Sequence, residues 1–210
     1  MRKIQHYLTE QDAEKIRRAV AEAESRTRGE IVPMIVQASD PYAHLHVTGG
    51  IAFAITAFVI SAAFWPKSHP SWFLIFEIIG YVVGSFLFRL DSTKRLFLTK
   101  REMDEKVFDR ALRAFYEHEL HKTKESTGIL ILASLLERRV QILADRGIHE
   151  KVGDHEWRKA ADRLVQALKE KRTGDGFCEA IGICADVLAR HFPAATENPN
   201  ELPDQPILGE

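Results

Sequence analysis

Two long apolar runs stand out in a chain whose other segments mix apolar and charged positions. The first, residues 47–65, holds nineteen residues without an ionised side chain, and the second, residues 72–88, holds one acidic residue. Residues 66–70, PKSHP, form a helix-breaking turn between the runs. Because about twenty helical residues cross a bilayer core of roughly 30 Å, the pattern predicts two transmembrane helices, over about 47–65 and 71–89.

Glu77 is the acidic residue in the second run. A charged side chain near the centre of a span costs on the order of 2.5–3.5 kcal/mol. The same run has eleven Leu, Ile, Val or Phe residues, which at roughly 0.3–0.6 kcal/mol each favour insertion by about 3–7 kcal/mol. Insertion is therefore still predicted. This membrane carboxylate either marks a proton or ion path or has an ordinary hydrogen-bond partner or interfacial position.

The alternative to a membrane hairpin is a pair of buried helices in a soluble core. A domain of 210 residues could bury one helix that is apolar on every face, but not two. Trp65 and Trp72 also lie at one shared boundary, as interfacial anchors do. We therefore predict that the lipid bilayer surrounds this hairpin.

Lys and Arg residues near the spans predict the orientation. The turn between the spans has only Lys67, whereas five basic residues follow the second span: Arg89, Lys94, Arg95, Lys100 and Arg101. Basic residues concentrate on the cytoplasmic side of bacterial inner-membrane and other cell-membrane proteins. We expect a multi-pass protein with two spans, with the soluble domain and both termini in the cytoplasm.

The polar segment before the first span predicts one helix and one strand. Thr9 and Asp12 have capping-box spacing, and apolar residues then recur at helical spacing up to Ala23. The helix should end near Arg28-Gly29. EIVPMIVQ, residues 30–37, is typical of a strand, in which Pro33 indicates an edge position or a bulge.

The polar segment after the second span predicts a longer series of elements. A helix begins after Thr99, and its apolar face comprises Phe108, Ala111, Leu112 and Phe115. GILILASLL, residues 128–136, and RRVQILAD, residues 138–145, form a β-hairpin with a tight connection. Two amphipathic helices follow. Asp154 caps the first, whose buried face is Trp157, Ala161, Leu164, Val165 and Leu168, and the second ends at Phe192-Pro193.

Strands that alternate with amphipathic helices predict an α/β layer structure. A lone strand is not stable by itself, so the two polar segments should assemble into one domain interrupted by the membrane hairpin. We assign residues 1–46 to its first part, 47–90 to the hairpin, and 91–193 to its second part. Residues 194–210 form a Pro-rich tail that is expected to be extended or disordered.

Composition excludes several kinds of function. The net charge of −1 gives no basic field for nucleic acid, so no nucleic-acid partner is expected. The sequence has no P-loop, dinucleotide fingerprint or nucleophile elbow. Cys178 and Cys184, the only cysteines, are expected to be packing residues, because no basic partner is near either thiol in the sequence.

LADRGIHEKVGD, residues 143–154, is the polar cluster most typical of a ligand site, because it follows a strand end. Asp145, Glu150 and Asp154 could coordinate a hard cation such as Ca²⁺ or Mg²⁺, with Glu137 or Glu30 nearby, and Arg146 could bind a phosphate. The alternative is structural, with a turn at Asp145 and a helix cap at Asp154.

The segments GILILASLLERRVQILADRGIHEKVGDHEW, residues 128–157, and RTRGEIVPMIV, residues 26–36, resemble the TPM domain family. HFPAATENPNELPD, residues 191–204, is similar to its membrane-protein branch with an inserted hairpin. The resemblance implies an α/β sandwich with a small mixed sheet flanked by helices and interrupted by a two-helix transmembrane hairpin. It also implies a link to phosphatase activity and divalent-cation binding. Such members commonly have two acidic residues in the turn where this chain has Leu136-Glu137-Arg138.

Two functions follow as hypotheses. The first is a membrane-tethered binding or assembly module of unknown ligand, with other membrane proteins as partners. The alternative is a divalent-cation-dependent phosphatase that uses Glu137, Asp145 and Asp154. A transport role centred on Glu77 is a third possibility, and two spans form no pathway for it unless the protein oligomerises.

Overall fold

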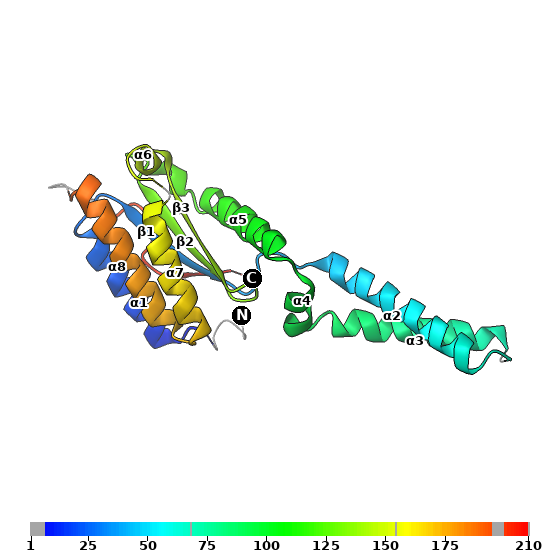
Figure 1. Cartoon of the computed structure of the whole chain (residues 1–210). Helices are drawn as coiled ribbons and strands as arrows, with labels where there is room; N and C mark the ends of the chain where they lie inside the picture. The colour runs from blue at the N-terminus through cyan, green and yellow to red at the C-terminus, as the bar shows by residue number, and fades with distance from the viewer. Residues whose placement is uncertain (1–6, 68, 154, 195–199, 210) are drawn as a thin grey trace. The chain divides into compact units, whose positions relative to one another are not determined.

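The computed structural model describes residues 7–67, 69–153, 155–194 and 200–209, and it divides into two compact units (Figure 1). The α/β unit comprises Met1–Asp40 and Arg101–Glu210, and the hairpin unit comprises Pro41–Lys100.

The α/β unit contains a mixed sheet of four strands. These are β1 (Glu30–Val36), β2 (Gly128–Ser134), β3 (Arg139–Ala144) and β4 (Ile207–Gly209), in the spatial order β3-β2-β1-β4. β1 runs parallel to both β2 and β4, whereas β2 and β3 form an antiparallel hairpin. The small mixed sheet and the β-hairpin predicted from the sequence are confirmed.

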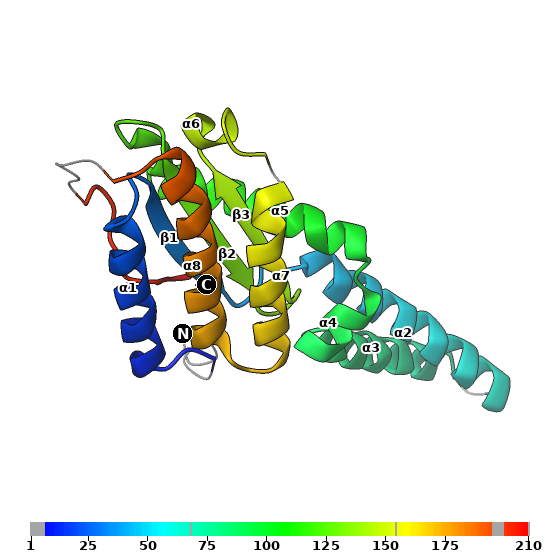
Figure 2. The same ribbon diagram turned by 60° about the vertical axis from the view of Figure 1, so that its left-hand side comes forward.

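Helices cover both faces of this sheet (Figure 2). α1 (Glu10–Glu24), α7 (His155–Lys169) and α8 (Thr173–His191) lie side by side over one face, and α5 (Lys100–Glu117) packs on the other. Successive strand residues alternate between the two cores: Ile31 and Ile35 join the core under α1 and α8, and Val32 and Met34 join the core under α5. Strands buried on both faces explain the continuous apolar runs of β1 and β2.

The capping box predicted at the start of α1 is present. The Asp12 N–H donates to the Thr9 hydroxyl at 3.1 Å, and the Thr9 N–H donates to the Asp12 carboxylate at 3.1 Å. The helix ends at Glu24, earlier than expected, because the next residues leave it to pair with the end of α8 through the bridge between Thr27 and Pro193.

The buried face of α5 is rotated from the predicted one. Ala111 and Phe115 are buried as expected, but Phe108 and Leu112 are 45% and 40% exposed. Their places in the core are taken by three other residues of the helix: Met103, Val107 and Ala114. Small side chains at Ala111 and Ala114 let the helix approach the sheet closely, so the bulkier Phe and Leu lie at the flank.

Pro33 occupies β1 at a point where one side of the strand has no ladder partner among the described residues. The Glu30 N–H donates to Thr127 on the β2 side, so alternation turns the nitrogen of Pro33 to the opposite side. Pairing with β4 begins only at Met34. The Ile31 N–H on this open side donates instead to the Glu24 carboxylate at 2.9 Å. A residue without an N–H therefore fits there.

The C-terminal segment contributes to the sheet, which the sequence did not predict. β4 adds three residues to β1, and the Leu202 N–H donates to the Glu30 carboxylate at 3.1 Å. Three residues are too few for a recognisable alternation, so this strand depends on the edge that β1 offers. The preceding residues 195–199 lie outside the described part of the chain.

Short helical segments complete the α/β unit. η2 (Leu120–Lys122) is a 3₁₀ turn before β2, and α6 (Arg146–His149) follows β3.

The buried face of α7 is Trp157, Ala160, Leu164, Ala167 and Leu168. Ala161 and Val165, which we expected in that face, are only half-buried. α8 ends at His191, with Phe192 as its C-cap, in agreement with the prediction.

The hairpin unit consists of α2 (Ala43–Phe64), α3 (Pro70–Leu87) and the short α4 (Asp91–Phe97), which the sequence did not predict. α2 and α3 pack at backbone distance. A Cβ added at Gly80 would lie 2.8 Å from the Phe53 carbonyl, and one at Gly84 would lie 2.6 Å from the Gly49 carbonyl. The pair Gly80 and Gly84 has the G-x-x-x-G spacing of closely packed membrane helices.

The outer faces of α2 and α3 are apolar and exposed. Ile55 is 59% exposed and Ile78 is 64% exposed, with many apolar neighbours at similar values. Both helices are long and apolar enough to cross a membrane. Their burial is low, which distinguishes them from the core helices of the α/β unit.

Candidate functional site

Glu137 lies in the turn between β2 and β3, beside the carboxyl ends of the parallel strands β1 and β2. Its side chain is buried. One carboxylate oxygen accepts the Ser39 N–H at 3.0 Å, and the other accepts the hydroxyl of Ser134. The carboxylate thus ties the end of β2 to the segment that follows β1. It occupies the edge of the sheet where α/β proteins commonly bind ligands.

The chemistry available around Glu137 is limited. A carboxylate has about four lone-pair positions, and the buried hydroxyl of Ser39 has no hydrogen-bond partner within the described residues. A hard cation usually takes six or more oxygens, several of them from carboxylates. Among the described residues, no group of three or more His, Cys, Asp or Glu side chains is placed to hold a metal.

Two ion pairs surround this end of the sheet. Lys106 lies 3.2 Å from Asp40, and Arg139 lies 2.6 Å from Asp104. Both pairs connect α5 to residues at the end of β1 or the start of β3. Asp40 and Asp104 therefore already have cationic partners within the protein.

Asp145 and Arg146 lie at the opposite end of the sheet. The Asp145 N–H donates to the Gly128 carbonyl at the start of β2, and its carboxylate accepts the Arg146 N–H at 2.7 Å as the N-cap of α6. Its second oxygen is buried and has no partner within the described residues. The Arg146 side chain is exposed and pairs with Glu150 at 2.9 Å.

The structure therefore separates Glu137 from Asp145, Arg146 and Glu150. Glu137 and Asp145 lie at opposite ends of β3, whose six residues span roughly 20 Å at about 3.4 Å each. Asp154, the third carboxylate, lies outside the described residues. The structural alternative for Asp145 matches the geometry, because its carboxylate caps a helix.

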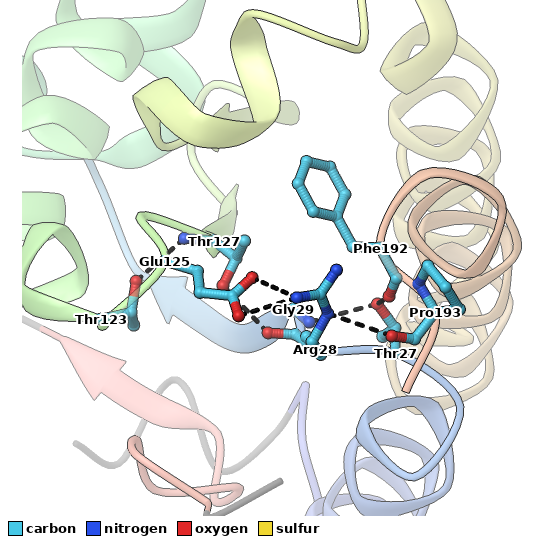
Figure 3. Close-up of polar contacts among 8 residues, drawn as sticks. All are labelled: Thr27, Arg28, Gly29, Thr123, Glu125, Thr127, Phe192 and Pro193. Atoms are coloured by element: carbon cyan, nitrogen blue, oxygen red, sulfur yellow. Dashed lines mark hydrogen bonds and ion pairs between the residues drawn. The ribbon is translucent and has the colours of Figure 1, made fainter. Parts of the chain in front are cut away.

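A dense polar network lies beside the start of β1 and β2 (Figure 3). The Thr27 hydroxyl donates to the Phe192 carbonyl at 2.7 Å, and the Arg28 guanidinium lies between the Pro193 carbonyl at 3.1 Å and the Glu125 carboxylate at 2.8 Å. The Thr127 hydroxyl donates to the Arg28 carbonyl at 2.9 Å. These contacts join β1, β2 and the end of α8. The segment RTRGE, residues 26–30, therefore has a structural role here.

Two buried carboxylates stand beside this network. Burial, together with the nearby Glu30, raises the pKa of Glu24 to about 8, even though the Ile31 N–H favours its charged form. Burial also raises the pKa of Glu30, opposed by backbone N–H groups including that of Leu202. Each carboxylate satisfies a backbone donor, so both hold segments of the fold in place.

Glu77 lies on α3 at half-buried depth. Spacings of three and seven residues put it on the same helix face as Gly80 and Gly84, which contact α2.

Both cysteines belong to the α/β unit. Burial raises the pKa of Cys184 to about 12 and also raises that of Cys178, which keeps both thiols protonated at neutral pH.

Sequence reasoning missed Ser39, Ser134 and Glu24 as polar residues with specific roles. Ser134 ends an otherwise apolar strand three residues before Glu137, and this was the available signal for their contact. No such signal exists for Ser39 or Glu24, because their partners depend on how the strands pair.

Comparison with known proteins gives a family match over part of the chain and a similar fold. The family model of the TPM domain matches residues 91–187. The fold is similar to the NMR structure of the BA42 protein from the psychrophilic bacterium Bizionia argentinensis, with a TM-score of 0.63 and 20% sequence identity over 100% of both chains. No curated protein matches the sequence.

Proposed function

We propose, on the premise that this chain contains a TPM domain, that it is an integral membrane protein in which that domain serves as a membrane-tethered binding module. In this proposal α2 and α3 span the cell membrane, and the α/β unit and both termini lie in the cytoplasm. The domain recruits or helps to assemble another protein at the membrane surface.

The pairing of β1 with β2 carries the membrane proposal. β1 precedes the hairpin in the sequence, β2 follows it, and the two strands are paired over seven residues. Both strands must therefore lie on one side of any membrane that the hairpin enters. The two apolar helices must cross together or not at all, which is the arrangement that a two-span hairpin provides.

The exposed surface of the hairpin supports the proposal that lipid surrounds it. Its helices use glycines to contact each other and direct their large apolar residues outward. Water would penalise such a surface, because a contiguous apolar patch of this extent is rare on a soluble monomer. Membrane helices associate through small residues in this way.

Residues after α3 support the cytoplasmic side for the α/β unit. Lys94 and Arg95 lie on α4, next to Leu96 at 79% exposure and Phe97 at 58%. A short helix with exposed apolar side chains beside basic ones fits the interface of an anionic leaflet. The turn between α2 and α3, on the other side of the proposed membrane, has only one basic residue, Lys67.

A binding role is favoured over catalysis because the candidate acids are separated and already in use. Glu137 accepts two hydrogen bonds within the fold, and Asp145 caps α6 at the other end of the sheet. A cation-dependent phosphatase needs its carboxylates to converge on one ion.

Membrane integration is tested by fractionation. The full chain should sediment with membranes, resist extraction at alkaline pH and dissolve in mild detergent. Sidedness is tested by labelling Lys67→Cys and, as a matched control, Glu105→Cys in intact cells with a membrane-impermeant maleimide. Labelling at position 67 alone is expected. Recovery of the chain in the supernatant without detergent would contradict the proposal.

A divalent-cation-dependent phosphatase is the second candidate, favoured by the buried Ser39 hydroxyl beside Glu137. Phosphate release from a model phosphoester, with Mg²⁺ or Ca²⁺, separates the candidates in wild type, Glu137→Gln and Asp145→Asn. Turnover that disappears in Glu137→Gln would establish the enzyme. No turnover in wild type, with no melting shift from either cation, would leave the binding module.

A further inference from the structure

The open edge of β3 is a candidate site for the ligand of the binding module. This inference rests on the proposed binding function. We propose that an extended, acidic peptide segment of another protein adds to β3 as a fifth strand of the sheet. β3 is the outermost strand on its side of the order β3-β2-β1-β4. An edge strand that is neither short nor covered offers main-chain hydrogen bonds to such a segment.

The backbone of β3 has three residues directed toward the open edge. The Asp145 N–H donates to the Gly128 carbonyl, so Asp145 and the residues at even spacing from it pair with β2. The intervening residues Val140, Ile142 and Ala144 then direct their N–H and C=O groups outward. The Gln141 side-chain amide donates to the Ile142 carbonyl at 3.2 Å, a contact that an added strand would replace with a main-chain hydrogen bond.

A groove runs along this edge and has the size of a peptide site. Its volume is about 530 Å³, and β3 residues 140–144 form its floor. Phe108 of α5 contributes one wall, and Trp157 and Ala161 of α7 contribute the other. Pockets of 300–1,000 Å³ with apolar walls and a few polar groups are typical binding sites. The rotated face of α5 is what leaves Phe108 available to this groove.

The charge of the groove selects an acidic partner. None of its lining residues is an acid, and Arg158 and His149 supply its charged or titratable groups. Arg158 forms no ion pair within the described part of the chain, whereas Lys159 and Arg163 line a neighbouring pocket with Asp162 and do not line the groove. Arg158, together with the titratable His149, gives the groove a basic rim, which complements an acidic segment and speeds its association.

The other edge of the sheet is less suited to a partner. β4 has only three residues. On the same side of β1, the Ile31 N–H is already bonded to the Glu24 carboxylate, and Pro33 has no N–H to donate. Short strands and proline are common ways of blocking an edge. β3 has neither feature, so the two edges differ in their capacity to accept a strand.

The test uses the full chain in lipid nanodiscs and the synthetic peptide acetyl-Glu-Val-Thr-Val-Glu-Val-Asp-amide. Hydrogen exchange read by mass spectrometry should slow at least tenfold at the outward-directed amides of Val140, Ile142 and Ala144. Two control peptides keep the length: one replaces every acid by lysine, and the other carries N-methyl groups on the amides of one edge. Neither should protect β3. Equal protection by all three peptides, or none by the acidic one at millimolar concentration, would overturn the proposal.

Variants of the basic rim separate charge from folding. Arg158→Glu should weaken peptide binding about tenfold and reduce its salt dependence. Lys169→Glu makes the same charge change on the same helix, outside the groove, and should leave binding unchanged. Equal binding by both variants, with wild-type melting temperatures, would exclude the charged site. Protection of β3 that instead requires self-association of the chain, seen by sedimentation, would identify a second copy as the occupant and overturn the proposal.

Failure of this proposal can be told from failure of the membrane proposal. Nanodisc incorporation reports on the hairpin, and exchange at β3 reports on the groove. A chain that enters nanodiscs but does not bind the peptide would contradict only the proposed strand site, and membrane integration would stand.

Discussion

The α/β unit and the hairpin unit use the same apolar residues in opposite ways. Ile31, Ile35 and Ile129 in the sheet are at most 1% exposed, whereas Ile55 and Ile78 in the hairpin are about 60% exposed. In the first unit, apolar side chains create the interior. In the second, glycines form the contact between helices and the apolar side chains point outward.

This difference indicates that the two units are adapted to different solvents. Burial of apolar area from water stabilises the α/β unit by about 25 cal/mol per Å². That term gives no drive for helix association in lipid, where close packing of small residues matters instead. The same substitution should therefore have different consequences in the two units.

The largest expected effect comes from placing charge on the outer face of the hairpin. Ile55→Arg combined with Ile78→Arg should abolish membrane accumulation, because each Arg costs about 2.5–3.5 kcal/mol near a span centre. The fraction of chain in sedimented membranes measures the effect. Arg substitution at Lys159 and Lys169, exposed in the α/β unit, is the control and should leave membrane accumulation unchanged. A doubly charged hairpin that still accumulates would show that lipid does not surround it.

A pH effect in the α/β unit is expected next. The pKa of Glu24 is raised from its ordinary value of 4.5 to about 8, so the folded state keeps a proton that the unfolded state releases. Stability from this group is complete below about pH 4.5 and is lost as pH rises through about 8, by about a few kcal/mol. Glu24→Gln should flatten that loss in thermal melts between pH 5 and 9.

Glu22→Gln is the matched control for this pH effect, because Glu22 lies on the exposed side of the same helix. Its melting curves should follow wild type at every pH. Parallel curves for wild type and Glu24→Gln would contradict the raised pKa.

A smaller effect is expected from the glycine contact in the hairpin. Gly84→Leu places side-chain atoms where a Cβ already lies 2.6 Å from the Gly49 carbonyl, so overpacking should cost about 1–3 kcal/mol. Gly182→Leu in α8 meets nothing within 4 Å and should stabilise its helix by up to about 1 kcal/mol. Melting in one detergent compares them, and shifts of the same sign would contradict the close approach of α2 and α3.

The smallest effect is expected at Arg146. Its ion pair with Glu150 is exposed and should contribute about 0.5 kcal/mol or less. Arg146→Ala should change the melting temperature by no more than its measurement error. A clear loss would indicate that this side chain has a partner beyond the helix surface.

The fold was predictable from the sequence where a pattern was long enough to be read. The alternating and continuous apolar runs predicted β1, β2 and β3, and the capping box located the start of α1. β4 and α4 were not predicted, since three and seven residues give no distinct period. The buried face of α5 differs from the predicted one. Residue spacing identifies the apolar stripes along a helix, but it does not tell which of two neighbouring stripes packs against the sheet.

The candidate site was less predictable, because it depends on distance in space. Residues 137–154 are close in sequence, yet β3 carries the chain across the sheet between Glu137 and Asp145. Asp145 could be assigned as a cap because that role is local. The contact of Glu137 with Ser39 joins residues on either side of the hairpin, and no local pattern encodes it.

The position of the hairpin between β1 and β2 also affects how the chain is made. About ninety residues separate the end of β1 from the start of β2. At about 5–20 residues per second, the ribosome needs roughly 5–18 s to supply the partner strand. During that interval β1 is a seven-residue apolar strand without a sheet, and Pro33 in its middle would hinder pairing with other nascent chains.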